Sequence, residues 1–159
     1  MKPSAMSLLD RRIIEAEMLA NIYRTLRAHH SRDHALALVQ ETIEQGAFQA
    51  GQAFSAQAPG KPDFAHFQTI VDVWRGTGAL TLENVRAGDR SLCFHVTRCA
   101  YVAAYRDMGL PPELCSMISC CRDEPFARGY SPNIAMERPQ TIGGGAKYCD
   151  FTFVWESGA

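Results

Sequence analysis

Apolar residues recur at three- and four-residue spacing over the first half of the chain, a pattern typical of amphipathic helices. It predicts one helix over residues 7–27 and a second from residue 31 or 32 to about 56. Prolines and a glycine within residues 59–62 break the pattern. A third helix is expected from residue 64 to about 74, with Asp63 as its N-cap.

The hydrophobic period changes to two after Ala79, which favours strands. Residues 80–86 and 91–98 flank a short loop and predict a hairpin, in which Gly88 is expected to supply a positive φ. Alternation in the second strand divides its side chains between two faces. We expect Leu92, Phe94 and Val96 to point one way, and Cys93, His95 and Thr97 the other.

The last third of the chain predicts two more helices and two more strands. The helices are expected over residues 99–107 and about 113–120, with irregular chain after residues 121–125. The strands are expected over residues 134–138 and 148–155, separated by a turn at three consecutive glycines. The order ααα-ββ-αα-ββ predicts an α+β fold in which N-terminal helices pack with a small antiparallel sheet. No linker or repeat divides residues 1–159, so we expect a single domain.

Composition and charge restrict the function classes. The 159 residues carry 16 Lys and Arg against 17 Asp and Glu, with 47% apolar residues. These values exclude a disordered tail and a polybasic nucleic-acid-binding protein. The sequence has no apolar run long enough for a membrane span, and Asp10, Arg11 and Arg12 interrupt the N-terminus where a secretory signal needs apolar residues. We therefore expect a cytoplasmic protein with no membrane partner.

Six cysteines are the one unusual feature of the composition. Cytoplasmic redox conditions favour free thiols, so we expect no structural disulfide and ask instead about burial, metal binding or catalysis. Cys99 is expected at a helix N-terminus beside Arg98, where the helix dipole and the guanidinium group would lower the pKa of its thiol. Cys99 is therefore the first choice for a reactive cysteine, whereas Cys115 is expected to be buried and inert.

Other thiols stand beside carboxylates. Asp123 follows Cys120 by three residues and would act as a base, although burial of a thiol there is the simpler interpretation. Strand alternation places Cys149 on the core face, either as a small apolar residue or at the edge of a cavity. It places Asp150 on the opposite face, where an ordinary exposed carboxylate is equally consistent.

Several spaced elements occur together in one order between residues 98 and 153. They are Arg98-Cys99-x-Tyr101, Met108-Gly109-Leu110 with Glu113-Leu114, Cys120-x-x-Asp123, Gly129-Tyr130-x-Pro132-x-Ile134, Thr141-x-x-x-Gly145 and Cys149-Asp150-Phe151. In these elements the chain resembles the L-2-amino-thiazoline-4-carboxylic acid hydrolase family. The resemblance implies hydrolytic opening of a small carboxylated ring that contains nitrogen and sulfur, or of a similar cyclic amide-like C–N bond.

Such a reaction needs a nucleophile, a proton donor, hydrogen-bond donors for developing charge and a cation for the carboxylate. The resemblance supplies candidates for each role. The nucleophile would be Cys99, Cys120 or Cys149; proton transfer would fall to Asp123 or Asp150; hydrogen bonds would come from Thr141 and the amides near Gly145; and the carboxylate would bind Arg98 or Arg138.

Three further hypotheses accompany this interpretation. Cys99, Cys120 and Cys149 could instead converge on a zinc ion whose bound water attacks, although the chain lacks a Cys-x-x-Cys pair. The chain could also be a non-catalytic small-molecule-binding domain of the 4-vinyl reductase type. Finally, the apolar stripe of the first helix predicts a homodimer, because one core of this size would not cover it. That stripe consists of Leu9, Ile13, Ile14, Met18 and Ile22.

Overall fold

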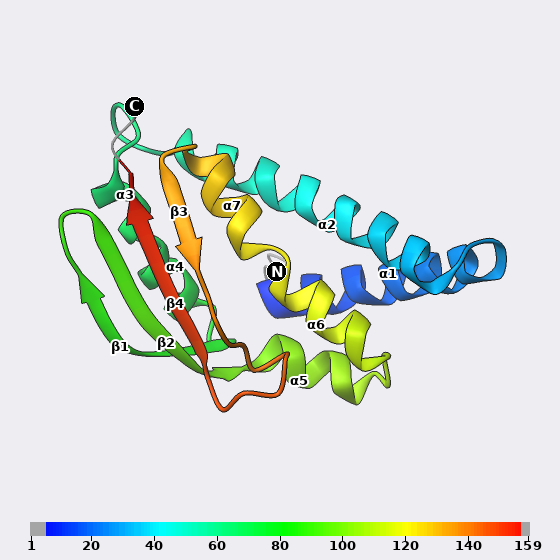
Figure 1. Ribbon diagram of the computed structural model, residues 1–159. Coiled ribbons are helices and arrows are strands. Elements are labelled where there is room, and N and C mark those ends of the chain that lie inside the picture. Colours follow the sequence, from blue (N-terminus) through cyan, green and yellow to red (C-terminus); the bar gives the residue numbers. More distant parts are fainter. Residues whose placement is uncertain (1–5, 157–159) are drawn as a thin grey trace, which may run out of the picture.

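The protein is an α+β domain whose helices pack on an antiparallel sheet (Figure 1). A computed structural model describes residues 6–156. The elements in chain order are α1 (Leu8–His29), α2 (Arg32–Ser55), α3 (Phe64–Gln68), α4 (Ile70–Gly76), β1 (Leu80–Ala87), β2 (Ser91–Cys99), α5 (Ala100–Asp107), α6 (Pro112–Cys120), α7 (Asp123–Tyr130), β3 (Ile134–Glu137) and β4 (Cys149–Trp155). The α+β prediction is confirmed.

The sheet has the strand order β1-β2-β4-β3, and every neighbouring pair is antiparallel. Phe94 of β2 lies opposite Phe151 of β4, and their stacked rings are 5.0 Å apart. The predicted alternation holds, because the side chains on one face form the core while those on the other remain partly exposed. The buried set comprises Leu92, Phe94, Val96, Cys149, Phe151 and Phe153.

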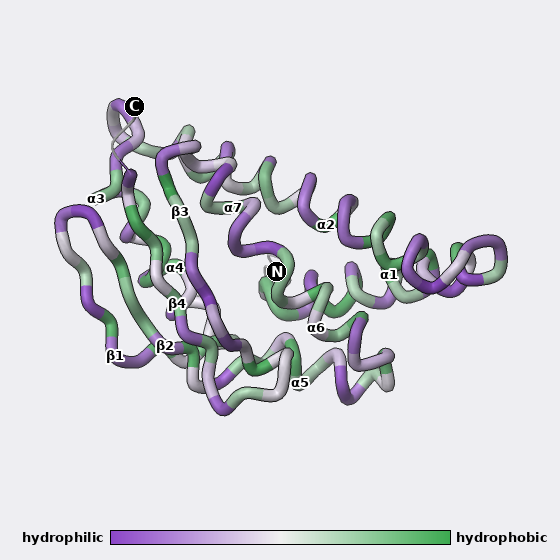
Figure 2. The backbone as a smooth tube through the Cα atoms, viewed as in Figure 1, coloured by the Kyte–Doolittle hydropathy of each residue, from purple (hydrophilic) through white to green (hydrophobic). Residues whose placement is uncertain are grey.

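The first two helices form a long hairpin that extends away from the sheet (Figure 1). Ser7 and Ser31 cap them, since each serine Oγ accepts a hydrogen bond from the backbone N–H three residues later. The colour of the α2 tube changes from hydrophobic to hydrophilic within its turns, as expected for an amphipathic helix (Figure 2). The buried side of α2 includes Val39, Ile43 and Phe54.

Helix α7 was not expected, because the sequence predicted that the preceding helix ends at about Cys120 and that irregular chain follows residues 121–125. Proline and glycine usually disfavour a helix, but Pro125 and Gly129 both lie within α7. Pro125 is the third residue of α7, where a missing N–H costs no helical hydrogen bond. Gly129 lies against the Phe48 backbone of α2, where a larger residue would not fit. Tertiary packing thus makes this segment helical.

Two smaller expectations also differ from the structure. The predicted third helix is divided at Thr69 into α3 and α4. Gly88 does not have the positive φ predicted for the hairpin loop; its N–H instead donates to the Ser91 carbonyl at 2.8 Å. The positive φ in this hairpin falls on Asn84, at 54°, where the strand pairing shifts between Glu83 and Arg86. Asparagine tolerates this conformation better than most residues.

Within residues 6–156, no helix combines the length and the apolar character that crossing a membrane requires.

Candidate functional site

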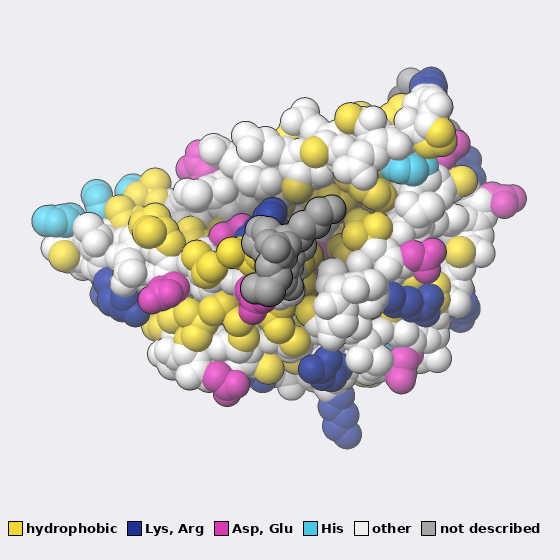
Figure 3. Space-filling view, turned by 180° about the vertical axis from the view of Figure 1, so that it is seen from behind, with side chains coloured by type: hydrophobic (Ala, Val, Ile, Leu, Met, Phe, Trp, Pro, Cys, Tyr) yellow, Lys and Arg dark blue, Asp and Glu magenta, His cyan; other side chains and the backbone are white. Residues whose placement is uncertain are grey.

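A cavity of about 330 Å³ lies between the sheet and the helices. Hydrophobic side chains gather in a hollow near the middle of the face drawn in Figure 3. Most of the cavity wall is apolar and aromatic, which is typical of sites for small organic molecules. The apolar lining includes Phe54, Ile70, Trp74, Leu80, Val96, Val102, Ile118, Phe126 and Phe151.

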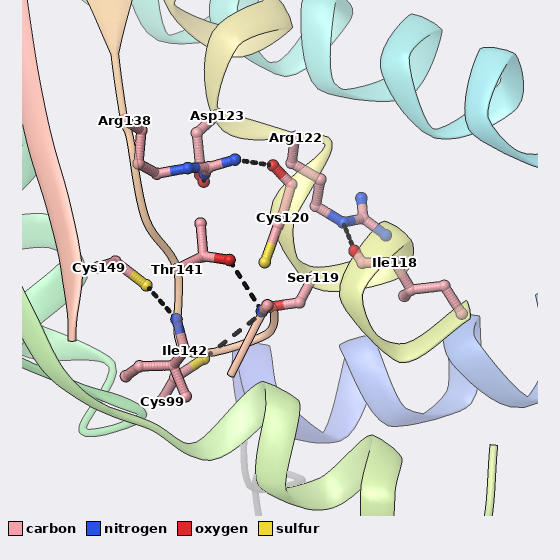
Figure 4. A network of polar contacts seen from close by, with 11 residues as sticks. Cys99, Ile118, Ser119, Cys120, Arg122, Asp123, Arg138, Thr141, Ile142 and Cys149 are labelled. Carbon is pink, nitrogen blue, oxygen red and sulfur yellow. Dashed lines mark hydrogen bonds and ion pairs between the residues drawn. The ribbon is translucent and has the colours of Figure 1, made fainter. Parts of the chain in front are cut away.

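Five of the nine predicted site residues line this cavity. They are Cys99, Cys120, Asp123, Arg138 and Cys149, which come from the end of β2, the α6–α7 junction, the segment after β3 and the start of β4. In Figure 4 the three thiols point into one region. Residues that are distant in sequence therefore form one polar region of a mostly apolar cavity.

Asp123 and Arg138 form an ion pair in the cavity wall. A second guanidinium nitrogen of Arg138, Nη2, donates to the Cys120 carbonyl at 2.7 Å, so Arg138 connects the carboxylate to the thiol-bearing residue (Figure 4). Its Nε is buried without a hydrogen-bond partner among the described residues. Burial raises the pKa of Asp123 to about 6, although Arg138 acts in the opposite direction. A carboxyl group with such a pKa exchanges a proton readily near neutral pH.

The prediction that the pKa of Cys99 is lowered is wrong. Cys99 does cap the N-terminus of α5, but burial raises the pKa of its thiol and outweighs hydrogen bonds from the Val102 backbone and Ser119. Arg98 does not offset this effect, because its Nη1 donates to the Gly78 carbonyl at 3.3 Å and the residue is exposed. Cys99 is therefore a neutral thiol at pH 7.

Cys149 is likewise neutral, since burial raises the pKa of its thiol to about 11. Its Sγ accepts a hydrogen bond from the Ile142 N–H at 3.2 Å. Cys120 Sγ lies beside the loop between β3 and β4, so close that a Cβ at Gly143 would be 2.8 Å from it. A larger residue at position 143 would therefore displace the Cys120 side chain.

The other four predicted site residues do not line the cavity. Arg98 is held at Gly78, as described above. Asp150 is on the opposite face of the sheet, where its Oδ1 is 3.6 Å from His95 Nε2. Thr141 lies near Cys120, but its Oγ1 accepts from the Gly144 N–H (Figure 4). The Gly145 N–H donates to the Ile142 carbonyl and is therefore already engaged within the turn.

The remaining cysteine expectations concern disulfides, burial and metal. All six cysteines are free thiols, and Cys115 is buried as predicted. Within residues 6–156, no group of three His, Cys, Asp or Glu side chains has the geometry to hold a metal ion. The arrangement of Cys99, Cys120 and Cys149 thus lends the zinc hypothesis no support, and that hypothesis stays an untested prediction.

Several polar cavity residues, among them Ser119, Arg12 and Arg122, were missed by the sequence reasoning. Ser119 Oγ is 3.9 Å from Cys99 Sγ, and Arg12 and Arg122 line the wall near the N-terminus of α1. Arg12 resembles an ordinary polar-face residue of an amphipathic helix. Arg122 lies within the Cys120-x-x-Asp123 element, and its position between two candidate site residues could have marked it as a further candidate.

Comparisons with known proteins show the fold and the family. No curated protein matches the chain. Among solved structures, the crystal structure of the phenol-responsive sensory domain of the transcription activator PoxR with phenol is similar in fold, with a TM-score of 0.55 and 12% sequence identity. The match covers 90% of this chain and 73% of that chain. The family model of L-2-amino-thiazoline-4-carboxylic acid hydrolase matches residues 11–153, so the chain belongs to this family.

Proposed function

We propose that the protein is a hydrolase that opens a small carboxylated ring by breaking a C–N bond of a cyclic amidine or amide. The observation that carries this proposal is the polar region of the cavity, where a thiol and an acidic group with a pKa near neutrality stand together in an apolar surrounding. Family membership supports the hydrolytic chemistry. The ring proposed as substrate is L-2-amino-thiazoline-4-carboxylate or a close relative.

The cavity fits a substrate of this size. Its volume of about 330 Å³ is at the small end of the range found for ligand pockets. Trp74, Val96 and Phe151 offer flat or branched apolar surface to the faces of a five-membered ring. An apolar wall binds water weakly, and polar interactions are stronger where water is scarce.

We assign the attack on the ring carbon to Cys120. Cys99 and Cys149 are disfavoured as nucleophiles, because burial raises the pKa of both thiols and makes each harder to deprotonate. Cys120 is the remaining thiol of the cavity wall; its own backbone carbonyl accepts the hydrogen bond from Arg138, and it stands three residues before Asp123. In this scheme the Asp123 carboxylate takes the Sγ proton as Sγ bonds to the ring carbon, and it returns that proton to the leaving nitrogen as the C–N bond breaks. Water then attacks the carbon bound to Sγ, the carbon–sulfur bond to Cys120 breaks, and a proton from the water restores the thiol as the opened product leaves.

Arg138 serves as a positioning residue in this scheme. Its ion pair with Asp123 fixes the carboxyl group, and its contact with the Cys120 carbonyl fixes the end of α6. The Arg138 guanidinium also lies over the Phe151 ring, 5.2 Å from the centroid, which restrains it further. Both Nη atoms are therefore occupied, which argues against the predicted role of Arg138 in binding the substrate carboxylate.

A second candidate function is binding without catalysis. The apolar majority of the cavity wall favours it, and so does a fold shared with a phenol-responsive sensory domain. A binding domain of the 4-vinyl reductase type would use the same cavity and would need no proton transfer.

One assay separates the two functions. The purified protein is incubated with L-2-amino-thiazoline-4-carboxylate, and products are followed by mass spectrometry while the thermal midpoint is measured in parallel. A hydrolase yields a product heavier by one water, whereas a binder shows a raised midpoint and unchanged substrate. Addition of a strong zinc chelator tests the metal hypothesis in the same assay: the thiol mechanism predicts unchanged turnover, and loss of turnover would favour zinc.

A further inference from the structure

Two arginines share one carboxylate at the wall of the cavity. Arg122 Nη2 is 3.4 Å from Glu15 Oε2, and Arg12 Nη1 pairs with the same oxygen. Arg122 Nε also donates to the Ile118 carbonyl at 3.0 Å, which fixes the guanidinium plane at the end of α6. Both arginines line the cavity, whereas Glu15 does not.

The charges around the cavity do not balance. Its lining contains three guanidinium groups, those of Arg12, Arg122 and Arg138, and one carboxylate, that of Asp123. Asp123 neutralises Arg138, and Glu15 neutralises only one of the other two arginines. The side chain of Arg122 is only 18% exposed, so solvent does little to screen the remaining charge. One net positive charge therefore remains where Arg12 and Arg122 meet.

The two arginines also repel each other. Burial lowers the pKa of Arg122, and the neighbouring Arg12 lowers it further. A bound monoanion would relieve this repulsion and complete the charge balance of the cavity. A carboxylate suits the site well, because a planar guanidinium group binds it through parallel charge-assisted hydrogen bonds.

We propose that Arg122 and Arg12 form an anion subsite that binds the carboxylate of the ligand, in place of the predicted Arg98 or Arg138. This inference rests on the proposed function only in taking the cavity as the ligand site. Cys120 and Arg122 are two positions apart in the chain and both line the cavity, and their side chains leave the chain in different directions (Figure 4). The ring carboxylate then lies at the arginine end while the ring carbon faces the thiols.

Binding of an unreactive pair of probes tests the subsite without turnover. Thiophene-2-carboxylate and thiophene-2-carboxamide have the same planar ring and differ in charge, and isothermal titration calorimetry gives the Kd of each. The wild-type protein should bind the carboxylate at least about tenfold more tightly, because one uncompensated charge in a shielded site supplies energy of this order. Equal affinities, or no detectable binding of either probe, would overturn the proposal.

Two variants of opposite charge make the test specific. Arg12→Gln removes the surplus positive charge and should weaken carboxylate binding about tenfold, whereas Glu15→Gln adds to the surplus and should tighten it by several-fold. Neither variant should change the Kd of the carboxamide by more than about twofold. If the two residues had only a structural role, each variant would change the Kd of the carboxylate and of the carboxamide in the same direction, or both variants would change the carboxylate Kd alike. Either result would contradict the anion subsite.

Failure of the subsite and failure of the proposed hydrolase are separable. If the subsite is wrong but the enzyme assignment is right, L-2-amino-thiazoline-4-carboxylate is still opened while Arg12→Gln and Glu15→Gln leave carboxylate affinity unchanged. If the enzyme assignment is wrong but the subsite is right, no product forms while the two variants still move the carboxylate Kd in opposite directions.

Discussion

Replacing Gly51 by alanine tests how closely α7 must approach α2 to form the cavity wall. A Cβ at Gly51 would stand 2.0 Å from the Phe126 carbonyl oxygen and 2.9 Å from the Tyr130 nitrogen, both backbone atoms of α7. Ordinary contact begins at 3.4 Å, so the two helices would have to separate by more than 1 Å. Gly46 lies in the same helix with no atom within 4 Å of its hypothetical Cβ, and it provides a matched control.

The two substitutions should have effects of opposite sign. Alanine at an exposed helical position is favoured over glycine by about 1 kcal/mol, so Gly46→Ala should stabilise the protein by roughly that amount. Gly51→Ala gains the same helical preference but forces backbone against backbone, and overpacking typically costs about 1–3 kcal/mol or more. We expect a net loss of about 2 kcal/mol, which places the two variants about 3 kcal/mol apart.

Urea denaturation followed by circular dichroism measures this difference through the unfolding midpoint. Because α7 carries Asp123 and Phe126 into the cavity wall, Gly51→Ala should also weaken ligand binding, whereas Gly46→Ala should leave it unchanged. Similar midpoints for the two variants would refute the reasoning, since they would mean that α7 does not depend on close contact with α2.

Three further predictions concern titration, thiols and assembly. The folded protein holds the Asp123 proton more tightly than the unfolded chain, so wild-type stability should fall by up to about 3 kcal/mol as pH rises from about 4 to 6. Asp123→Asn should show a flatter pH profile of the unfolding free energy over that range; parallel profiles would contradict the raised pKa. Because the pKa of Cys149 is about 11, native protein at pH 7 should alkylate at this site much more slowly than denatured protein, as peptide mass spectrometry would show, and equal rates would count against a buried neutral thiol. We propose a homodimer through the exposed apolar face of α1, where Met18 is 61% exposed; light scattering should give twice the chain mass, and Met18→Asp should give a monomer.

The sequence alone was sufficient to predict the helices and strands that have strong hydrophobic periodicity. The cap at Asp63, and the burial of alternate residues in β2 and β4, follow from local rules that the structure confirms. Helix α7 escaped those rules, because Pro125 and Gly129 read as helix breakers until their places in the first turn and at the α2 contact are known.

The site was predictable only in part. The family resemblance drew attention to Cys120, Asp123 and Arg138, which the fold brings together. It offered Asp150 as a proton-transfer residue, although strand alternation had already placed that side chain on the face opposite to the core. It gave no indication that Arg12 from α1 reaches the cavity. The reactivity first expected of Cys99 failed for a physical reason, since the sequence shows the helix terminus but not the depth at which the thiol is buried.

The most direct test of the central claim compares serine variants at three cysteines in the hydrolysis of L-2-amino-thiazoline-4-carboxylate. Cys120→Ser should lower kcat at least about a hundredfold, the scale of losing a principal catalytic group, with little change in thermal midpoint. Cys99→Ser should have a smaller effect, and Cys93→Ser, on the opposite face of the sheet, should behave like the wild type. Undiminished turnover by Cys120→Ser, with loss of turnover in Cys99→Ser, would contradict the assignment of the nucleophile to the end of α6.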